Sequence, residues 1–347
     1  MDRRSFLRYV GLSAAAAMAG CGRGKSQAAG VGDGRAQAKD EQAPQQEAAF
    51  AGTTGSRVVL VRSERWKKEV DVDSLRAGLV KGIVALTGAA NAAEGWRRLI
   101  RPDENVAIKV NCLAGPGLCS SPQLTTAVVE ELSAAGHPRG KIWVYERSSA
   151  ELEECGYELR AEEDEVKCLG SDEVGYDEQV TVTGEVGTWF SLIVSQWADA
   201  IINVPVAKDH DLAGISGALK NHFGSISNPN KLHLPDISRA IADVAAAEVI
   251  ARKQKIVIYD ALKVCYDGGP GFKPATTKAY GAVILTMDPV AADAVVMQII
   301  ERMRREEGLP SLFEREAKPD HVKIAADSEH GLGCAEREKI ELVEVEV

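Results

Sequence analysis

Short apolar runs rich in β-branched residues alternate along the chain with longer segments in which apolar residues recur at helical spacing. This alternation is typical of parallel strands that are buried on both faces and connected by helices. The sequence therefore predicts an α/β fold with a mostly parallel sheet and helices on both of its faces, arranged either as one body or as two lobes. The expected strands cover residues 57–62 and 105–111 and the runs that begin at residues 141, 199, 255 and 282.

Capping residues predict where several helices begin and end. Asp73 precedes apolar residues at helical spacing, and Gly88 is typical of a helix carboxyl end. Pro122 suits the first turn of a second helix, which is expected to end at Gly136. The alanine-rich segment 237–252 predicts one long helix.

The first 21 residues have the pattern of an export signal. Arg3 and Arg4 are followed by Ser-Phe-Leu-Arg and by an apolar run, 9–19, that is too short to span a bilayer. This segment resembles a twin-arginine signal peptide, and its end, Met-Ala-Gly-Cys, resembles a lipobox in which Cys21 receives the lipid. The resemblance implies export by the twin-arginine machinery to the periplasmic or cell-surface side, with a lipid anchor in the membrane. The alternatives are a frayed amphipathic helix and, without lipidation, a soluble exported protein.

Composition divides the rest of the chain into a tether and a folded domain. Residues 22–56 are rich in Gly, Gln, Ala and Lys and contain almost no large apolar side chains, which predicts a flexible tether. Residues 57–347 form the predicted α/β domain, in which no run of eighteen apolar residues occurs. The segment 151–189 is acidic and poorly periodic, and it predicts an inserted loop or a small β region.

The charge of the chain argues against a nucleic-acid partner. The formal net charge is −10, and no basic stripe with interleaved aromatic residues is present. Such a stripe is what a phosphate-tracking surface needs. The 45% hydrophobic content is sufficient for a sizeable core.

The cysteines do not have the spacing of a metal centre. Beyond Cys21, no two of them form a C-x-x-C pair, so we expect no self-contained iron–sulfur cluster. In an oxidising compartment, Cys112 could pair with Cys119 and Cys155 with Cys168, and buried free thiols are the alternative. The six cysteines of the domain are Cys112, Cys119, Cys155, Cys168, Cys265 and Cys334.

Polar residues follow several of the predicted strands. Ligands of open α/β sheets collect at the carboxyl ends of parallel strands, so a group of polar residues at these ends predicts a binding site. Taken singly, each of them could equally be a solvated loop residue or a helix cap. These residues are Lys109, Asn111, Lys208, Asp209, His210, Asp260, Lys263 and Asp288.

Five segments resemble, in order and spacing, the family called domain of unknown function 362, over residues 57–305. They are VAIKVN, IINVPVAKDH, GISGALKNHFGSI, DGGPG and LTMDPVAADAV. Members of that family are often fused to ferredoxin-like modules, which implies an iron–sulfur redox partner, although this chain carries no such module. The ten-residue separation of His210 and Lys220 is also similar to that in nickel-pincer lactate racemases, which implies a metal or a covalently held organic cofactor.

The segment 210–233 carries the candidate chemistry. Lys220 lies among apolar residues, and burial would lower its pKa enough for acid–base catalysis or Schiff-base formation. His210 could act beside it or ligate a metal, with Asp209 orienting the ring. The alternative is a surface lysine whose stem packs on Phe223. His222 and His233 are expected to be structural.

Further residues are expected to bind the substrate or cofactor. Gly217 and Gly269 lie in glycine-rich turns whose backbone amides could hold an anion, or which could simply be tight turns. The remaining binding residues are Lys109, Asn111, Lys208, Asp209 and Asn221.

Two functions are compatible with these patterns. The first is an exported, membrane-tethered enzyme, an oxidoreductase or isomerase, that acts on a small anionic substrate through Lys220 and His210. The second is a tethered protein that binds a ligand or assists a redox partner without catalysis.

Overall fold

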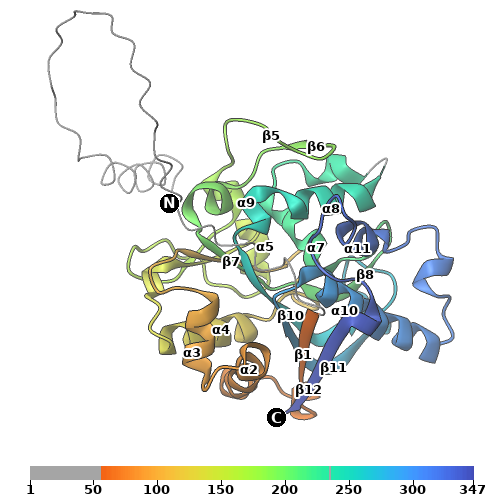
Figure 1. Cartoon of the computed structure of the whole chain (residues 1–347), viewed down its shortest axis with the longest axis horizontal. Helices are drawn as coiled ribbons and strands as arrows, with labels where there is room; N and C mark the ends of the chain where they lie inside the picture. The colour runs from red at the N-terminus through yellow and green to blue at the C-terminus, as the bar shows by residue number, and fades with distance from the viewer. Residues whose placement is uncertain (1–55, 234–235) are drawn as a thin grey trace, which may run out of the picture.

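The computed structural model describes residues 56–233 and 236–347, which fold around one large sheet (Figure 1). The predicted signal segment, Cys21 and the predicted tether up to residue 55 lie outside the described residues. Among the helices that are described, none is both long enough and apolar enough to cross a membrane.

The sheet has ten strands and is mostly parallel, which confirms the predicted α/β class. The eight strands of its main path follow the order β12-β1-β11-β10-β7-β2-β3-β4, and β8 and β9 join beside β10. Strand β11 is antiparallel to both β1 and β10. A division into two lobes is not confirmed. The strands of the main path are β1 (Ser56–Arg62), β2 (Val106–Lys109), β3 (Ile142–Tyr145), β4 (Lys167–Cys168), β7 (Ala200–Asn203), β10 (Gln254–Cys265), β11 (Thr277–Thr286) and β12 (Ile340–Glu346).

Both faces of the sheet are buried, because alternate residues of its strands enter two different cores. In β1, Val58 and Leu60 belong to one core, and Val59 and Val61 belong to the other. Side chains that alternate along a strand point to opposite faces, so each face needs its own cover of helices. The strands therefore read as continuous apolar runs in the sequence.

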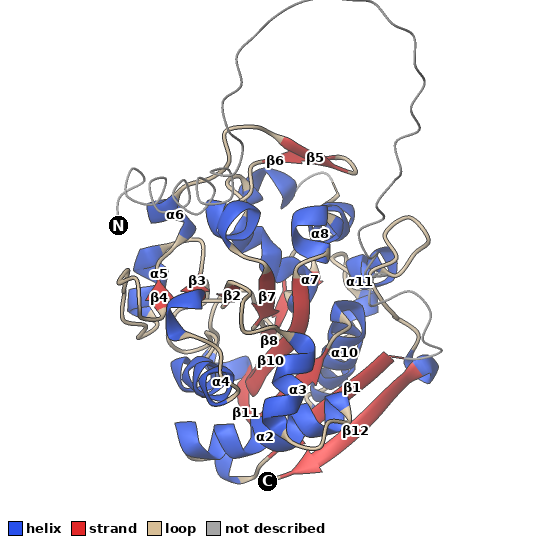
Figure 2. Cartoon of the chain, turned by 60° about the vertical axis from the view of Figure 1, so that its left-hand side comes forward, coloured by secondary structure: helices blue, strands red, loops and turns tan. Residues whose placement is uncertain are grey.

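The helices cover the two faces as separate groups (Figure 2). Helices α2 (Val72–Thr87), α3 (Ala92–Leu99) and α4 (Pro122–Ala134) contribute to one core. The other core receives residues from α7 (Gly217–Asn221), α8 (Ile237–Ala246), α10 (Pro289–Glu306) and α11 (Asp320–Ala325). The remaining helices are α5 (Ser149–Glu154), α6 (Ser171–Val174) and α9 (Glu248–Ala251).

Two helix predictions need correction. The amino-terminal cap of α2 is Asp71 rather than Asp73, because the Asp71 carboxylate accepts a hydrogen bond from the backbone N–H of Ser74 at 2.9 Å. The single helix predicted over 237–252 is broken at Ala247, whose extended backbone separates α8 from α9. Neither glycine nor proline marks this break, so the sequence contains no signal for it.

Other helix predictions are confirmed. Gly88 adopts the left-handed conformation at the end of α2, with φ 62°, as its place in the sequence predicts. Pro122 occupies the first turn of α4 behind the cap Ser121. The predicted small β region in 151–189 corresponds to a separate hairpin, β5 (Thr181–Thr183) with β6 (Val186–Thr188).

Strand β8 (Val206–His210) positions the candidate site. It pairs in parallel with the second half of β10, with Asp260 opposite Val206 and Cys265 opposite Lys208, while β7 pairs with the first half. The short strand β9 (Gly214–Ile215) returns antiparallel to β8 and leads directly into α7. The segment predicted to carry the chemistry therefore lies at the carboxyl edge of the sheet.

The cap of α2 gives a direct test of the corrected helix start. Replacing Asp71 with Ala removes the acceptor for the Ser74 N–H and should lower the free energy of unfolding by about 1 kcal/mol. Asp71→Asn should retain most of the stability, because Asn is also a good cap. Asp73→Ala is the matched control, since Asp73 is exposed in the first turn and should contribute only a few tenths of 1 kcal/mol. Urea denaturation of the three variants measures these differences, and equal losses for Asp71→Ala and Asp73→Ala would contradict the assignment.

Candidate functional site

Lys109, the last residue of β2, is fully buried and forms an ion pair with Glu146. Its Nζ lies 2.9 Å from Glu146 Oε1 and also donates to the Val110 carbonyl at 2.5 Å. Glu146 directly follows β3, so it lies at the same edge of the sheet and neutralises the buried charge. The sequence analysis missed Glu146, although its position after a predicted strand was the same signal that identified Lys109.

Gly224 allows the chain to approach this ion pair closely. A Cβ atom at Gly224 would lie 2.6 Å from Lys109 Nζ and 2.9 Å from Glu146 Oε1. Both atoms are buried and held by their mutual contact, so neither can move away at low cost. This position therefore requires glycine for steric reasons.

Lys208, Asn111 and Asn221 form a chain of hydrogen bonds. Lys208 Nζ donates to Asn111 Oδ1 at 2.8 Å, and Asn111 Nδ2 donates to Asn221 Oδ1 at 3.0 Å. Asn221 Nδ2 in turn donates to Asn203 Oδ1 at 2.8 Å and to the Lys109 carbonyl at 3.3 Å. The structure thus brings together four of the binding residues that the sequence predicts, which are Lys109, Asn111, Lys208 and Asn221.

The inner end of this network is structural. Asn203 donates to Gln254 Oε1 at 2.8 Å, and His222 Nε2 lies 2.8 Å from the same oxygen. Burial is the main cause that lowers the pKa of His222, to about 4, so its ring is neutral. His222 accordingly has the structural role expected from the sequence, whereas Asn203 and Gln254 were not identified.

Two further ammonium groups lie near each other at this edge, on Lys208 and Lys220. Lys208 is fully buried, and Lys220 is 9% exposed. Burial lowers the pKa of both side chains to about 8, and for Lys220 the charge of Lys208 lowers it further. Within the described part of the chain, Lys220 makes no hydrogen bond or ion pair, and its Nζ lies 4.7 Å from the centre of the Phe223 ring. The ammonium group therefore lies over the face of the Phe223 ring, and the residue is not a surface lysine.

His210 is neutral and presents a single donor. Its Nδ1 accepts hydrogen bonds from the backbone N–H groups of Leu212 at 3.1 Å and Ala213 at 3.3 Å, so the ring proton resides on Nε2. Burial, with a further contribution from Lys220, lowers the pKa of His210 to about 2. The 3.2 Å approach of Asp211 to Nδ1 is therefore not an ion pair.

His233 lies against His210, and its contacts are compatible with the structural role that the sequence analysis gave it. Its ring stacks on that of His210 with centroids 6.0 Å apart, and it also meets the edge of Phe223. A third histidine comes from far along the chain: burial, followed by the charge of Lys220, lowers the pKa of the buried His321 of α11 to about 3. His321 follows Lys220 by about 100 residues in the sequence, so no local pattern could predict that the two lie close together.

Asp209 lies on the other face of β8 and does not orient His210. Its Oδ2 pairs with Arg315 at 3.0 Å, and its Oδ1 accepts the backbone N–H of Gly269 at 2.6 Å. A Cβ at Gly269 would lie 2.2 Å from the Asp209 carbonyl oxygen. Because successive strand residues point to opposite faces, Lys208 and His210 share one face and Asp209 takes the other. The structure therefore shows Asp209 and Gly269 in contacts that hold the 267–272 turn against β8.

Asp293 of α10 anchors the helix that carries Lys220. Its carboxylate accepts the backbone N–H groups of Ala218 at 2.5 Å and Leu219 at 3.1 Å, at the first turn of α7. Gly217 has φ +72°, and a Cβ there would lie 2.4 Å from Asp293 Oδ2. Gly217 thus supports the site by admitting this carboxylate. The carboxyl group of Asp293, whose pKa burial raises to about 7, therefore occupies the backbone N–H groups of this turn in place of a ligand.

The candidate metal ligand His210 is not part of a preformed set of three ligands. Among the described residues, three or more His, Cys, Asp or Glu side chains bring their ligand atoms within 4.8 Å of one another only at Asp327, Glu329 and His330. Metal ligation by His210 stays a prediction, and its Nε2 is the atom left for it. Asp288, another candidate from the strand ends, caps α10 through the Ala291 N–H at 2.8 Å.

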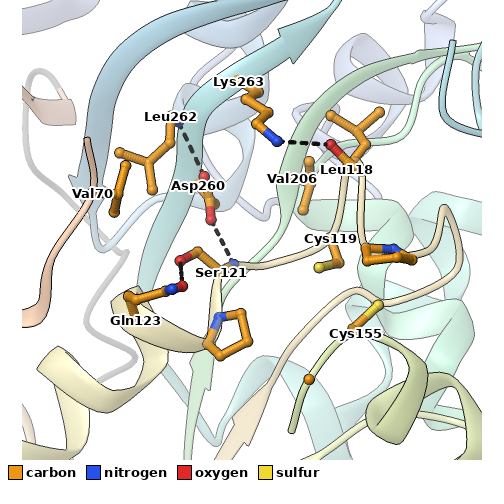
Figure 3. A pocket seen from close by; sticks show the side chains of 14 residues that line it. Val70, Leu118, Cys119, Ser121, Gln123, Cys155, Val206, Asp260, Leu262 and Lys263 are labelled. Carbon is orange, nitrogen blue, oxygen red and sulfur yellow. Dashed lines mark hydrogen bonds between the residues drawn. The ribbon is translucent and has the colours of Figure 1, made fainter. Parts of the chain in front are cut away.

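A cavity of about 400 Å³ opens between the loop that follows β2 and the second half of β10, with Lys263 on its wall (Figure 3). Asp260 and Ser121 lie on its wall, joined by a 2.7 Å hydrogen bond from the Ser121 N–H to the carboxylate. Burial raises the pKa of Asp260 to about 6. Lys109, Lys208 and Lys220 do not line this cavity. The loop 111–121 contacts both regions, because Asn111 binds Lys208 and Cys119 lines the cavity.

The family model described as Domain of unknown function (DUF362) matches residues 106–298, which is more than half of the chain. The chain belongs to the DUF362 family. The matched region begins at β2 and ends within α10, so it includes Lys109, Lys208, His210 and Lys220. No curated protein matches the chain significantly.

Gly224 provides a test of the close packing in this DUF362 domain. Gly224→Ala should push a methyl group into the Lys109–Glu146 pair and lower the free energy of unfolding by about 1–3 kcal/mol. Gly271→Ala is the matched control, because no atom lies within 4 Å of a Cβ at that position. Thermal and urea denaturation measure both variants. Equal stability of the two would show that the ion pair tolerates the methyl group.

Proposed function

We propose that this chain is an enzyme that acts on a small anionic substrate, a carboxylate or a phosphate, at the edge formed by β8 and α7. Lys208 and Lys220 bind the anion, the His210 Nε2–H donates to it, and Lys220 transfers a proton during the reaction. The observation that carries the proposal is the burial of the ammonium groups of Lys208 and Lys220, neither of which forms an ion pair with a carboxylate among the described residues.

The nearby carboxylates are paired with other cations or exposed to solvent, which supports the proposal that Lys208 and Lys220 carry a positive charge without a direct partner. Glu146 pairs with Lys109 at 2.9 Å, and its charge also raises the pKa of Lys208 without an ion pair between them. Asp209 pairs with Arg315 at 3.0 Å on the other face of β8. Asp211 raises the pKa of Lys220, but its side chain is 63% exposed and therefore well solvated. Because burying like charges is costly unless an opposite charge accompanies them, an anion bound between Lys208 and Lys220 relieves that cost.

The acidity of Lys220 supports a role in proton transfer. A group whose pKa is close to the working pH can both accept and release a proton. Burial lowers the pKa of Lys220 to about 8. The neutral His210 ring donates through Nε2–H without adding a charge that would compete for the proton. Lys208, held by Asn111, fixes the anion while Lys220 reacts.

We further propose that the enzyme works outside the cytoplasm, tethered to a membrane. The support is the twin-arginine pattern at Arg3 and Arg4 and the lipobox-like end at Cys21. Twin-arginine export moves proteins that are already folded, which suits a site built from residues as distant as Lys109 and Lys220. A metal or an organic cofactor loaded before export, and an iron–sulfur redox partner, remain compatible with this setting.

Replacing the two lysines tests the proposed function. Lys220→Met and Lys208→Met should each weaken the binding of pyruvate and of inorganic phosphate by about 10- to 100-fold, since each removes one charge-assisted hydrogen bond. Lys220→Met should also abolish exchange of the pyruvate methyl protons with deuterated water. Isothermal titration calorimetry measures the binding, and proton nuclear magnetic resonance measures the exchange.

Lys231→Met is the matched control, because Lys231 is exposed and lies near the same segment. It should leave both binding and exchange unchanged. Binding that depends on Lys208 and Lys220 without any exchange would assign the chain to the non-catalytic ligand-binding class. Anion binding that neither lysine affects would contradict the proposed site.

The pH dependence of binding follows from the lowered pKa values of the two lysines. Both are protonated below pH 8 and lose their charge above it, so the affinity for pyruvate, which stays anionic, should be constant from pH 6.5 to 7.5. Above pH 8 the affinity should fall by about tenfold per pH unit for each lysine that titrates. Calorimetric titrations between pH 6.5 and 9.5 measure this dependence. An affinity that stays constant up to pH 9.5 would show that the binding lysines have ordinary pKa values.

A further inference from the structure

Three cysteines from two separate segments meet beside the cavity. Cys112 and Cys119 belong to the loop that follows β2, and Cys155 is the residue at which α5 ends. The thiol of Cys155 interacts with the thiols of both Cys112 and Cys119. The sulfur of Cys155 also lies 3.5 Å from the Cys112 carbonyl oxygen. Cys155 is therefore the shared member of two thiol pairs.

This arrangement differs from the pairing that spacing in the sequence suggested. All six cysteines of the described residues are free thiols, and the pairs considered were Cys112 with Cys119 and Cys155 with Cys168. In the fold, Cys168 lies in β4, and the partners of Cys155 are on the loop after β2. Pairing the cysteines by their separation in the sequence therefore predicted Cys168 as the neighbour of Cys155, whereas its neighbours in the fold are Cys112 and Cys119.

Access from solvent distinguishes the two thiol pairs. Cys119 and Cys155 both line the cavity of about 400 Å³, and Figure 3 shows their sulfur atoms side by side on its wall. Cys112 is only 1% exposed and is not part of that wall. A small reagent that enters the cavity reaches Cys119 and Cys155 but not Cys112.

The geometry suits a bond between two thiols better than a metal held by three. The three sulfurs are not all within 4.8 Å of one another, since the described residues contain such a group only at Asp327, Glu329 and His330. A preformed trigonal thiolate set would need that closeness. A disulfide needs only one pair of adjacent sulfurs, whose side chains rotate to bring them together.

We propose that Cys119 and Cys155 form a disulfide by exchange with a low-molecular-weight disulfide that enters the cavity. The Cys119 thiolate attacks one sulfur of the reagent, so that the reagent's S–S bond breaks, a mixed disulfide forms on Cys119 and one small thiol leaves. The Cys155 thiolate then attacks the Cys119 sulfur and releases the second small thiol. The protein loses two protons and two electrons, and the reagent is reduced to two thiols.

The environment of the thiols makes this reaction slow at neutral pH. The contact with Cys112, followed by burial, raises the pKa of Cys155 to about 12, and the contact with Cys155 together with burial raises the pKa of Cys119. Only the thiolate reacts, so the rate should increase by about tenfold per pH unit from pH 7 to pH 9. The pair is therefore expected to become a lasting disulfide rather than a rapidly cycling one.

Peptide mapping of the full chain tests the proposal. The reduced protein is incubated with 2-hydroxyethyl disulfide at pH 8.5, its remaining thiols are alkylated, and tryptic peptides are analysed by mass spectrometry. We expect a peptide that contains Cys155 linked to the peptide 110–139, which carries both Cys112 and Cys119. Fragment ions between Leu113 and Leu118 should place the link on Cys119.

Three serine variants serve as controls. Cys119→Ser should abolish the link, whereas Cys112→Ser and Cys168→Ser should retain it at the wild-type yield. Circular dichroism of each variant shows that it is folded, and the Cys112→Ser result keeps the test informative if one of the others is not. A link through Cys112, a mixed disulfide on Cys119 that never resolves, or complete alkylation of Cys119 and Cys155 after prolonged incubation would each overturn the proposal.

Discussion

Lys109, Lys208 and Lys220 place ammonium groups inside the fold, at the edge where the parallel strands end. Burying a charge is costly unless hydrogen bonds and an opposite charge accompany it, so the surrounding structure must supply both. Glu146 supplies the charge for Lys109, and Asn111 supplies an oxygen to Lys208. The amide network behind them, the glycine at position 224 and the neutral histidines can each be understood as a response to this constraint. Among the described residues, no carboxylate forms an ion pair with Lys208 or Lys220, so their positive charges have no direct partner.

The sheet determines which polar groups reach that charge. Residues two apart on β8 share a face, so Lys208 and His210 point together while Asp209 points to Arg315. Had Asp209 shared the face of Lys208, it would have neutralised the ammonium groups and removed the reason for an anion to bind. The return strand β9 then brings α7 back over this face, with Asp293 holding its first turn. The alternation of side chains along β8 and the contact of Asp293 with α7 therefore bring lysines to one edge of the sheet from distant parts of the chain. Lys109 and Lys220, for example, are about 110 residues apart.

Local patterns in the sequence predicted the elements well and the contacts between them poorly. Apolar runs identified the strands, and the residues after them included Lys109, Asn111 and Lys208, because position at a strand end is a local property. The cap at Asp71 was misplaced by two residues, since both aspartates precede the same apolar pattern and only the hydrogen bond to Ser74 distinguishes them. The ion pair with Glu146, the stacking of His233 on His210 and the neighbours of Cys155 depend on how distant segments pack. A single sequence does not encode such packing in a readable pattern.

The loop 111–121 connects the proposed anion site to the proposed thiol pair. Asn111 binds Lys208, the adjacent Cys112 lies beside Cys155, and Cys119 lines the cavity at the far end of the same loop. Ser120 Oγ accepts the Asn111 N–H at 2.7 Å and donates to the Val204 carbonyl at 2.6 Å, so the base of the loop is tied to the segment that follows β7. These bonds fix Asn111 at one end of the loop, next to Lys208, and Ser120, which makes them, directly follows Cys119. The thiol pair and the lysines therefore act on the same loop, so the anion affinity of a lysine variant is compared with that of the wild-type chain in the same thiol state.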